Sequence, residues 1–139
     1  MKELAITITG LTGAAIAHAL GGWDMALQTL IIFMAADYAS GMVLAGIFKK
    51  SKHGGGTISS KRCWRGLVKK GMQLVLVLAG YRLDLIAGTD FVRMAAIIAF
   101  ISSELISIIE NASLMGIPVP PALQKALEVL NHGEVKKRP

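Results

Sequence analysis

Long apolar segments separated by short polar ones dominate the chain. Residues 4–23 contain no Asp, Glu, Lys or Arg, and about 20 such residues cross a ~30 Å hydrocarbon layer as a helix. Further apolar segments lie at about 25–48, 71–88 and 91–110. They lack the strict in–out alternation of membrane β-strands. The pattern therefore predicts an all-α integral membrane protein with four transmembrane helices, the first at about 4–22.

The connections between these segments differ in length. Residues 21–24 and 88–90 are long enough only for tight turns, so the four helices are expected to form two hairpins. A longer basic linker, 49–70, joins the hairpins and contains Gly54–Gly56, which disfavour a helix. Its second half, 59–70, fits either an amphipathic helix on an anionic membrane surface or a solvated loop.

The chain becomes polar after residue 110. Gly116, Pro118, Pro120 and Pro121 end the fourth helix, and the apolar spacing in 122–130 predicts a short amphipathic helix. A basic tail follows at 136–138. We therefore expect a transmembrane region at 1–110 and a cytoplasmic segment at 111–139.

Charge is distributed unevenly along the sequence. The net charge is +6, and eight of the 15 Lys and Arg residues lie in the linker 49–70, which has no Asp or Glu. Cytoplasmic loops of membrane proteins collect such residues. With four spans, both termini then also lie in the cytoplasm. The apolar flanks of the linker favour membrane lipid over nucleic acid as its partner. The residues expected to contact anionic lipid are Lys49, Lys50, Lys61, Arg62, Arg65, Lys69 and Lys70.

Ionisable residues within the apolar segments are the main functional candidates. A charge at the centre of a membrane helix costs about 2.5–3.5 kcal/mol, so it usually faces a bundle interior or water. From their depths we predict an Asp37–Arg82 ion pair and a second pair between Asp84 and Arg93. The complete set of intramembrane polar candidates is Asp37, Arg82, Asp84, Arg93, Glu104, Ser107, Glu110 and Asn111.

Two further patterns bear on assembly. Glu104, Ser107 and Asn111 share one helix face, which fits either a water-filled lumen or hydrogen bonds between helices. Small residues that let helices approach closely recur at four-residue spacing in the first span, and another follows Asp37 in the second. These helix-packing candidates are Gly13, Ala17, Gly21 and Gly41.

No catalytic site, metal site or cofactor is predicted. The histidines, His18, His53 and His132, fit no metal-ligand spacing. The glycine run has no phosphate-binding form, because a Lys-Ser/Thr step does not follow it. We expect a protein that is not an enzyme.

Two sequence blocks resemble the toxin-secretion/phage-lysis holin family. The first is Asp37-Tyr38-Ala39-Ser40-Gly41 with the basic linker after it, where the family usually has Thr-Gly after Asp-Tyr. The second runs from Glu104 through Glu110-Asn111 to Gly116-Ile117-Pro118, followed by the short helix. The N-terminal span matches only in hydrophobicity.

This resemblance implies a homo-oligomer that forms lesions in the bacterial cytoplasmic membrane. The lesions depolarise the membrane and let an endolysin reach the cell wall, without necessary direct contact between the two proteins. The residues alone leave two other classes open. One is a small ion channel or transporter subunit that uses Asp37, Arg82 and Glu104. The other is a membrane-anchored binding module that acts through 49–70.

Overall fold

The computed structural model describes residues 1–52, 54 and 57–135, with the side chains of 131–135 excepted. Its helices are α1 (Lys2–Ala19), α2 (Met25–Gly46), α3 (Ser60–Ala87), α4 (Val92–Leu114) and α5 (Pro121–Val135). The described residues contain no strand, so the predicted all-helical fold is confirmed for them. His53, most of the glycine run and the basic tail 136–138 lie outside the described residues.

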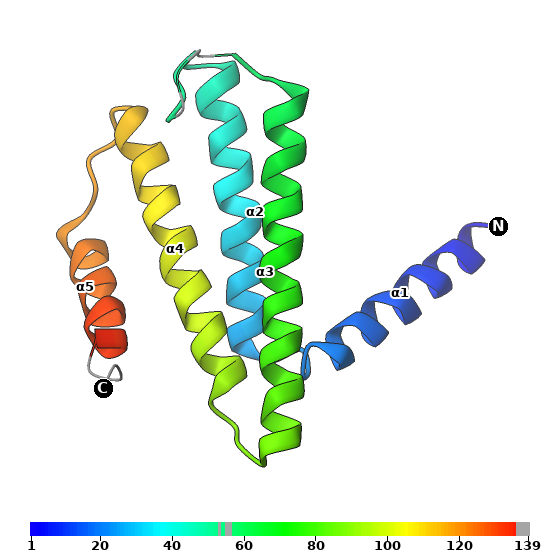
Figure 1. The fold of residues 1–139 in the computed structure, drawn as a ribbon. Helices are drawn as coiled ribbons and strands as arrows, with labels where there is room; N and C mark the ends of the chain where they lie inside the picture. Colours follow the sequence, from blue (N-terminus) through cyan, green and yellow to red (C-terminus); the bar gives the residue numbers. More distant parts are fainter. Residues whose placement is uncertain (53, 55–56, 136–139) are drawn as a thin grey trace.

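Helices α2, α3 and α4 form a bundle with roughly parallel axes (Figure 1). Helix α4 packs against α2, α3 and α5, whereas α2 and α3 approach each other closely at only a few positions. Helix α5 turns back along α4. Helix α1 leaves the lower end of the bundle at a steep angle and has no buried residue (Figure 1).

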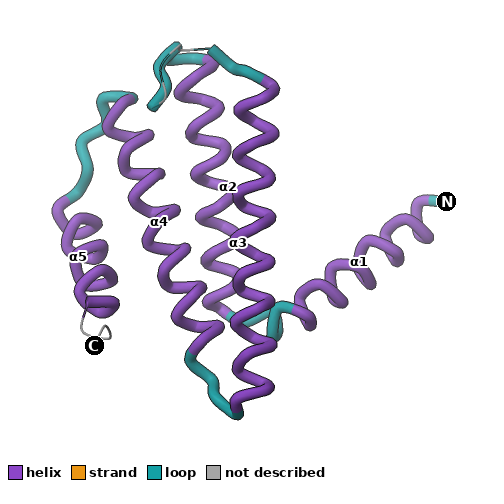
Figure 2. Tube along the Cα trace, viewed as in Figure 1, coloured by secondary structure: helices purple, strands orange, loops and turns teal. Residues whose placement is uncertain are grey.

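Local sequence sets where the bundle helices begin and end (Figure 2). Asp24 is the N-cap of α2, and its Oδ1 accepts a hydrogen bond of 2.9 Å from Leu27 N. Gly88 ends α3 with φ of 68°, a left-handed conformation that glycine adopts without a Cβ penalty. A short turn then leads from Gly88 into α4.

The basic linker predicted at 49–70 is divided between a loop and a helix. Helix α3 begins at Ser60 with Ser59 as its N-cap, so the second half of the linker is helical, which was one of the two alternatives for 59–70, and this helix continues into the apolar segment expected at 71–88. Residues 60–70 therefore continue into the apolar part of the same 28-residue helix. This places the end of the basic segment inside the bundle, beside α2 and α4.

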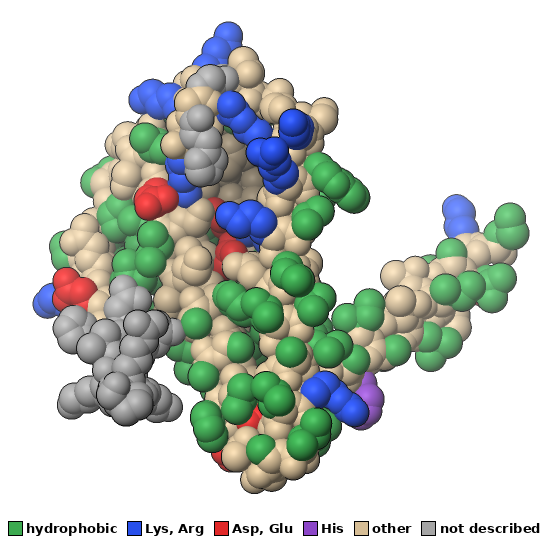
Figure 3. Space-filling model, in the orientation of Figure 1, with side chains coloured by type: hydrophobic (Ala, Val, Ile, Leu, Met, Phe, Trp, Pro, Cys, Tyr) green, Lys and Arg blue, Asp and Glu red, His purple; other side chains and the backbone are tan. Residues whose placement is uncertain are grey.

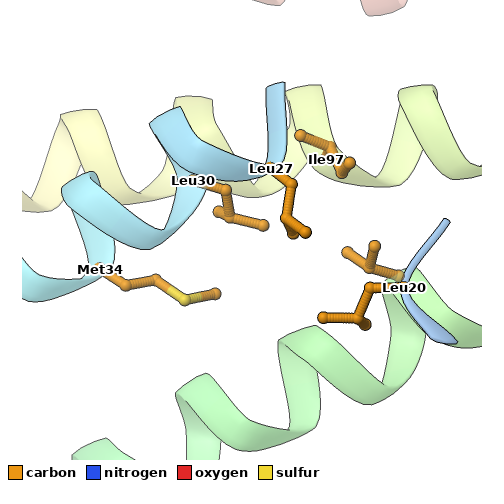
Figure 4. Packing of buried hydrophobic residues seen from close by; sticks show 6 residues of the cluster. Leu20, Leu27, Leu30, Met34 and Ile97 are labelled. Carbon is orange, nitrogen blue, oxygen red and sulfur yellow. The ribbon is translucent and has the colours of Figure 1, made fainter. Parts of the chain in front are cut away.

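The apolar core lies at the lower end of the bundle. Leu27, Leu30 and Met34 follow one face of α2 and pack with Ile97 of α4 and with Leu20, which ends α1 (Figure 4). Leu27, Leu30 and Ile97 are completely buried. In a bilayer, where lipid is as apolar as leucine, such contacts stabilise mainly through close packing.

Large apolar side chains also cover the outside of the bundle. On α3, Val75, Leu83 and Ile86 are 52–81% exposed. Helices α2 and α4 are long and apolar enough to cross a membrane, by length and composition alone. Helices α1 and α3 do not meet the same measure. The prediction of four spans is therefore supported for two of the four helices.

Candidate functional site

Lys70 connects three helices through its ammonium group. Its Nζ lies 2.8 Å from Oδ2 of Asp37 on α2 and 2.5 Å from Oε2 of Glu104 on α4. The side chains of Lys70, Asp37 and Glu104 are only 14%, 17% and 5% exposed. Two carboxylates thus share one ammonium in the interior. We refer to these three residues as the Lys70 cluster.

Asn111 extends the Lys70 cluster along the contact between α4 and α2. Its Nδ2 donates to Ser40 Oγ at 2.8 Å and lies 3.3 Å from both the main-chain oxygen and Oδ1 of Asp37. Asn111 is 2% exposed. A Cβ at Gly41 would lie 3.8 Å from the same amide nitrogen, an ordinary contact distance. A continuous polar interface therefore joins two otherwise apolar helices.

The loop after α2 returns to α4 through lysines. Lys52 Nζ donates to Ser107 O at 2.8 Å and to Ser107 Oγ at 2.6 Å, and it lies 3.2 Å from Glu110 Oε2. Lys50 Nζ donates to the main-chain oxygen of Leu114 at 3.2 Å. That oxygen belongs to the last turn of α4, where carbonyl groups lack partners within the helix and favour a cation.

A cavity of about 760 Å³ opens beside these groups. Its wall is formed by α2, α3, α4 and the loop between α2 and α3, and it includes the whole Lys70 cluster. Figure 3 shows Lys and Arg side chains gathered at this end of the molecule, with acidic side chains deeper between the helices. The oxygen Oε1 of Gln73, another wall residue, is buried without a hydrogen-bond partner among the described residues.

Arg93 and Asp24 form a second polar cluster at the opposite end of the bundle, which we call the Arg93 cluster. Its guanidinium donates to the main-chain oxygens of Leu20 and Gly22, at 2.5 and 3.2 Å. It also pairs with Asp24 Oδ2 at 2.6 Å. Arg93 is 7% exposed. A Cβ at Gly21, which has φ of 91°, would lie 2.6 Å from Arg93 Nε, so only glycine fits this turn.

Asp84 holds the start of α4 from the neighbouring helix. Its two carboxylate oxygens accept hydrogen bonds from Val92 N at 3.0 Å and Arg93 N at 2.9 Å, and Oδ1 also accepts from Thr89 Oγ1. These are N–H groups that a helix cannot satisfy internally. Nearby, the hydrogen bond from Arg93 holds the pKa of Asp24 below its usual value of 3.8.

Both predicted ion pairs are wrong in their partners. Asp37 pairs with Lys70 rather than Arg82, because the early start of α3 brings Lys70 to the level of Asp37. Arg82 lies about three turns further along α3 and is exposed. The guanidinium of Arg93 pairs with Asp24, and only its main-chain nitrogen binds Asp84.

The predicted stripe on the fourth apolar segment faces the bundle. Glu104, Ser107 and Asn111 all make contacts with lysines or with α2 and line the same cavity. In the single chain, these contacts match hydrogen bonding within one subunit. The same residues border a space open enough to admit water, so the lumen alternative stays open.

The small residues predicted to mediate helix packing lie in different environments in the structure. A Cβ at Gly13 would have nothing within 4 Å, and Ala17 is the only partly buried residue between Lys2 and Ala19. Gly21 lies in the turn that Arg93 occupies, not on a helix face. Gly41 alone faces a neighbouring helix, at Asn111.

Most residues predicted to contact anionic lipid remain available at one end of the bundle. Lys49, Lys50, Lys61, Arg62, Arg65 and Lys69 are exposed, whereas Lys70 is turned inward. Lys52, Asp24 and Gly80 were not predicted as site residues. One sequence pattern could have shown that Lys70 faces the bundle. The inward face of α3 repeats at three- and four-residue spacing through Lys70, Gln73, Val77, Gly80 and Asp84.

Metal binding has no support in the geometry. Among the described residues, no group of three or more His, Cys, Asp or Glu side chains is placed to hold a metal ion. The carboxylates of Asp37 and Glu104 instead contact the ammonium group of Lys70. The Lys70 cluster can hold α2, α3 and α4 together through charge. If these helices separated, its charged groups would become exposed.

Residues 14–132 match the bacteriophage holin family. The chain belongs to this family. The match includes the Lys70 cluster and the Arg93 cluster, so it covers every bundle helix. The resemblance seen in the sequence is thereby confirmed. Membership supports a holin role and, with the apolar helices α2 and α4, indicates a membrane protein.

Individual relatives agree with this assignment. An uncharacterized protein of Listeria innocua is 36% identical over 92% of this chain and 86% of its own length. An uncharacterized 14.9 kDa protein of Clostridium perfringens is 39% identical over 81% of each chain. A protein of Bacillus phage phi105 named "Probable holin" is 24% identical over 80% of this chain and 78% of its own. No solved structure matches the chain.

Proposed function

We propose that this holin oligomerises in the bacterial cytoplasmic membrane and forms lesions that depolarise it and let an endolysin reach the cell wall. The observation that carries the proposal is the Lys70 cluster. It joins α2, α3 and α4 through charges that an apolar environment penalises unless they are paired or hydrated. Family membership supports the same role.

The proposed topology has four spans with both termini in the cytoplasm. The basic end of the bundle then faces the cytoplasm, since cytoplasmic loops of membrane proteins carry an excess of Lys and Arg. This end comprises the loop after α2 and the start of α3. The Arg93 cluster faces outward. Helix α1 and the apolar part of α3 cross the membrane in contact with lipid or with neighbouring subunits.

Lesion formation follows from the chemistry of the polar interface. While one subunit stands alone, the ammonium of Lys70 binds both Asp37 and Glu104 and offsets one of their two negative charges, and Asn111 donates a hydrogen bond to Ser40. Separation of α4 from α2 and α3 exposes these groups, which then need water. Several subunits arranged with this surface toward a common centre supply a hydrated lumen, while their exposed apolar faces meet lipid.

Controlled expression in a bacterium tests the proposal. The protein is induced with and without a co-expressed endolysin, and membrane potential and culture turbidity are followed together. The expected result is loss of potential in both cultures and lysis only with endolysin. Cells that retain their potential and never lyse would contradict the proposal. Loss of potential without release of endolysin would favour the ion channel alternative.

A matched pair of variants ties the result to the structure. Lys70→Met removes the ammonium that three helices share, whereas Lys61→Met removes the same charge from an exposed position of α3 that does not line the cavity. Lysis is expected to change strongly only in the first variant. Immunoblotting of the membrane fraction shows whether both variants accumulate equally.

A further inference from the structure

The cavity beside the Lys70 cluster has the chemistry of a binding site for a phospholipid head group. We propose that it binds the phosphate of one anionic phospholipid from the cytoplasmic leaflet. The inference rests on the proposed orientation, in which this end of the bundle lies at the cytoplasmic membrane interface. It goes beyond lysis, because it assigns a ligand to a single subunit.

Charge in the cavity wall is strongly unbalanced. Five basic side chains line the cavity, against the two carboxylates of Asp37 and Glu104. Lys70 and Lys52 already pair with acidic side chains. The remaining basic residues, Arg62, Arg65 and Lys69, are exposed on successive turns of α3. The deep part of the cavity is therefore compensated, and its mouth carries an excess of positive charge.

The three basic residues lie along one side of α3 where it borders the cavity. Arg62, Arg65 and Lys69 follow three- and four-residue spacing, so they share one helix face. That face begins in the first turn of α3, where unpaired N–H groups add positive potential. Arg62 is oriented by a hydrogen bond of 3.4 Å from its Nη1 to Ser51 Oγ in the opposite loop. Guanidinium groups bind phosphate oxygens in a fixed fork geometry.

Apolar side chains at the same cavity distinguish a lipid from a free anion. Met42 and Ile58 line the cavity, and they are 41% and 55% exposed. Met42 lies on α2, and Ile58 lies in the loop before α3. A phosphate at the mouth would place acyl chains or a glycerol backbone against such groups. Basic pockets between membrane helices on the cytoplasmic side bind lipid head groups in this manner.

The single cysteine provides a local reporter. Cys63 is the only cysteine of the chain, is partly buried and lines the same cavity. Its labelling by a maleimide therefore reports on this cavity and on no other place in the protein. The experiment uses the full-length protein in detergent micelles that contain phosphatidylcholine alone, phosphatidylcholine with phosphatidylglycerol, or phosphatidylcholine with inorganic phosphate.

Two double variants separate the site from general surface charge. Arg65→Gln with Lys69→Gln removes two positive charges from the cavity mouth. Lys49→Gln with Lys61→Gln removes two positive charges from exposed positions at the same end that do not line the cavity. For each protein, the measured quantity is the labelling rate with phosphatidylglycerol divided by the rate with phosphatidylcholine alone. This ratio cancels any change in the intrinsic reactivity of the thiol.

Phosphatidylglycerol is expected to slow labelling about fivefold or more in the native protein and in the Lys49/Lys61 variant, since one basic side chain near an anionic lipid contributes roughly a fivefold effect. The Arg65/Lys69 variant should lose most of this protection. Equal protection in both variants, or none in the native protein, would overturn the proposal. Protection by inorganic phosphate equal to that by the lipid would assign the site to a free anion instead. Lysis is not measured, so these outcomes are independent of the lesion-forming role.

Discussion

Lys70 Nζ and Asp37 Oδ2 lie 2.8 Å apart, although 33 residues separate them in the sequence. Glu104 completes the contact from a third helix. Each of the three residues is costly in an apolar environment when it stands alone, and their pairing offsets part of that cost. The stability of the bundle is therefore sensitive to any change that leaves one member unpaired.

Loss of the ammonium group should be more damaging than loss of the whole cluster. Lys70→Met leaves two buried carboxylates unpaired and is expected to destabilise the bundle by about 3–5 kcal/mol. Adding Asp37→Asn and Glu104→Gln removes the unpaired charges and should restore most of the stability. The measurement is denaturation of the purified protein in mixed micelles, followed by circular dichroism. A triple variant less stable than Lys70→Met would contradict this pairing.

A glycine pair on α3 tests the close approach of α3 to α4. A Cβ at Gly80 would lie 3.2 Å from both the Cα and the N of Arg93, so Gly80→Ala is expected to force the helices apart at a cost of about 1–3 kcal/mol. A Cβ at Gly71 meets nothing within 4 Å. Gly71→Ala should stabilise the helix by up to about 1 kcal/mol. Denaturation of both variants under one condition gives the comparison, and equal effects would exclude a specific contact at Gly80.

The Arg93–Asp24 ion pair should make the turn of residues 21–24 sensitive to acid. The folded pKa of Asp24 is lowered, so its contribution to stability is complete well above pH 3.8 and is lost as pH falls through the lowered folded value. Limited proteolysis at the turn of residues 21–24 should therefore accelerate in acid. Asp24→Asn should be cleaved faster at neutral pH and should lose the acid dependence. A native-like pH profile in this variant would assign the dependence to another group.

Asn111 is expected to stabilise the contact between α2 and α4 more than its size suggests. Asn111→Ala leaves Ser40 Oγ and Asp37 without the amide donor in a buried interface, which costs about 1–3 kcal/mol. Ser113→Ala, on the exposed side of the same helix, should stay within about 0.5 kcal/mol of the native protein. Thermal denaturation distinguishes them, and similar losses would show that the amide contacts add little.

The helices and the identity of the polar residues could be predicted from the sequence, because apolar length and charge cost are local properties. The acidic and amide candidates on α2 and α4 were found in this way. Their partners were not predictable by comparing depths. Depth depends on where each helix enters the bundle. Placing Lys70 in a linker outside the bundle left Arg82 as the expected partner of Asp37, about three turns beyond the lysine that Asp37 contacts.

The position of Arg93 shows a second limit of reasoning from sequence. Its partners are the main-chain oxygens of Leu20 and Gly22 and the side chain of Asp24. Main-chain oxygens carry no residue identity, so no pattern of side chains points to them. The fit depends on the conformation of Gly21, which only the folded turn reveals.

The glycine turn after α1 affects how α1 is oriented relative to the bundle. Gly21 and Gly22 both have positive φ, and α1 beyond them is exposed along almost its whole length. Arg93 holds the turn itself, whereas α1 has no buried residue and borders the bundle only near its C-terminal end, where His18 and Ala19 lie beside Tyr81 and Arg82 of α3. In the proposed membrane oligomer, the bilayer and neighbouring subunits would therefore determine how α1 is tilted relative to the bundle.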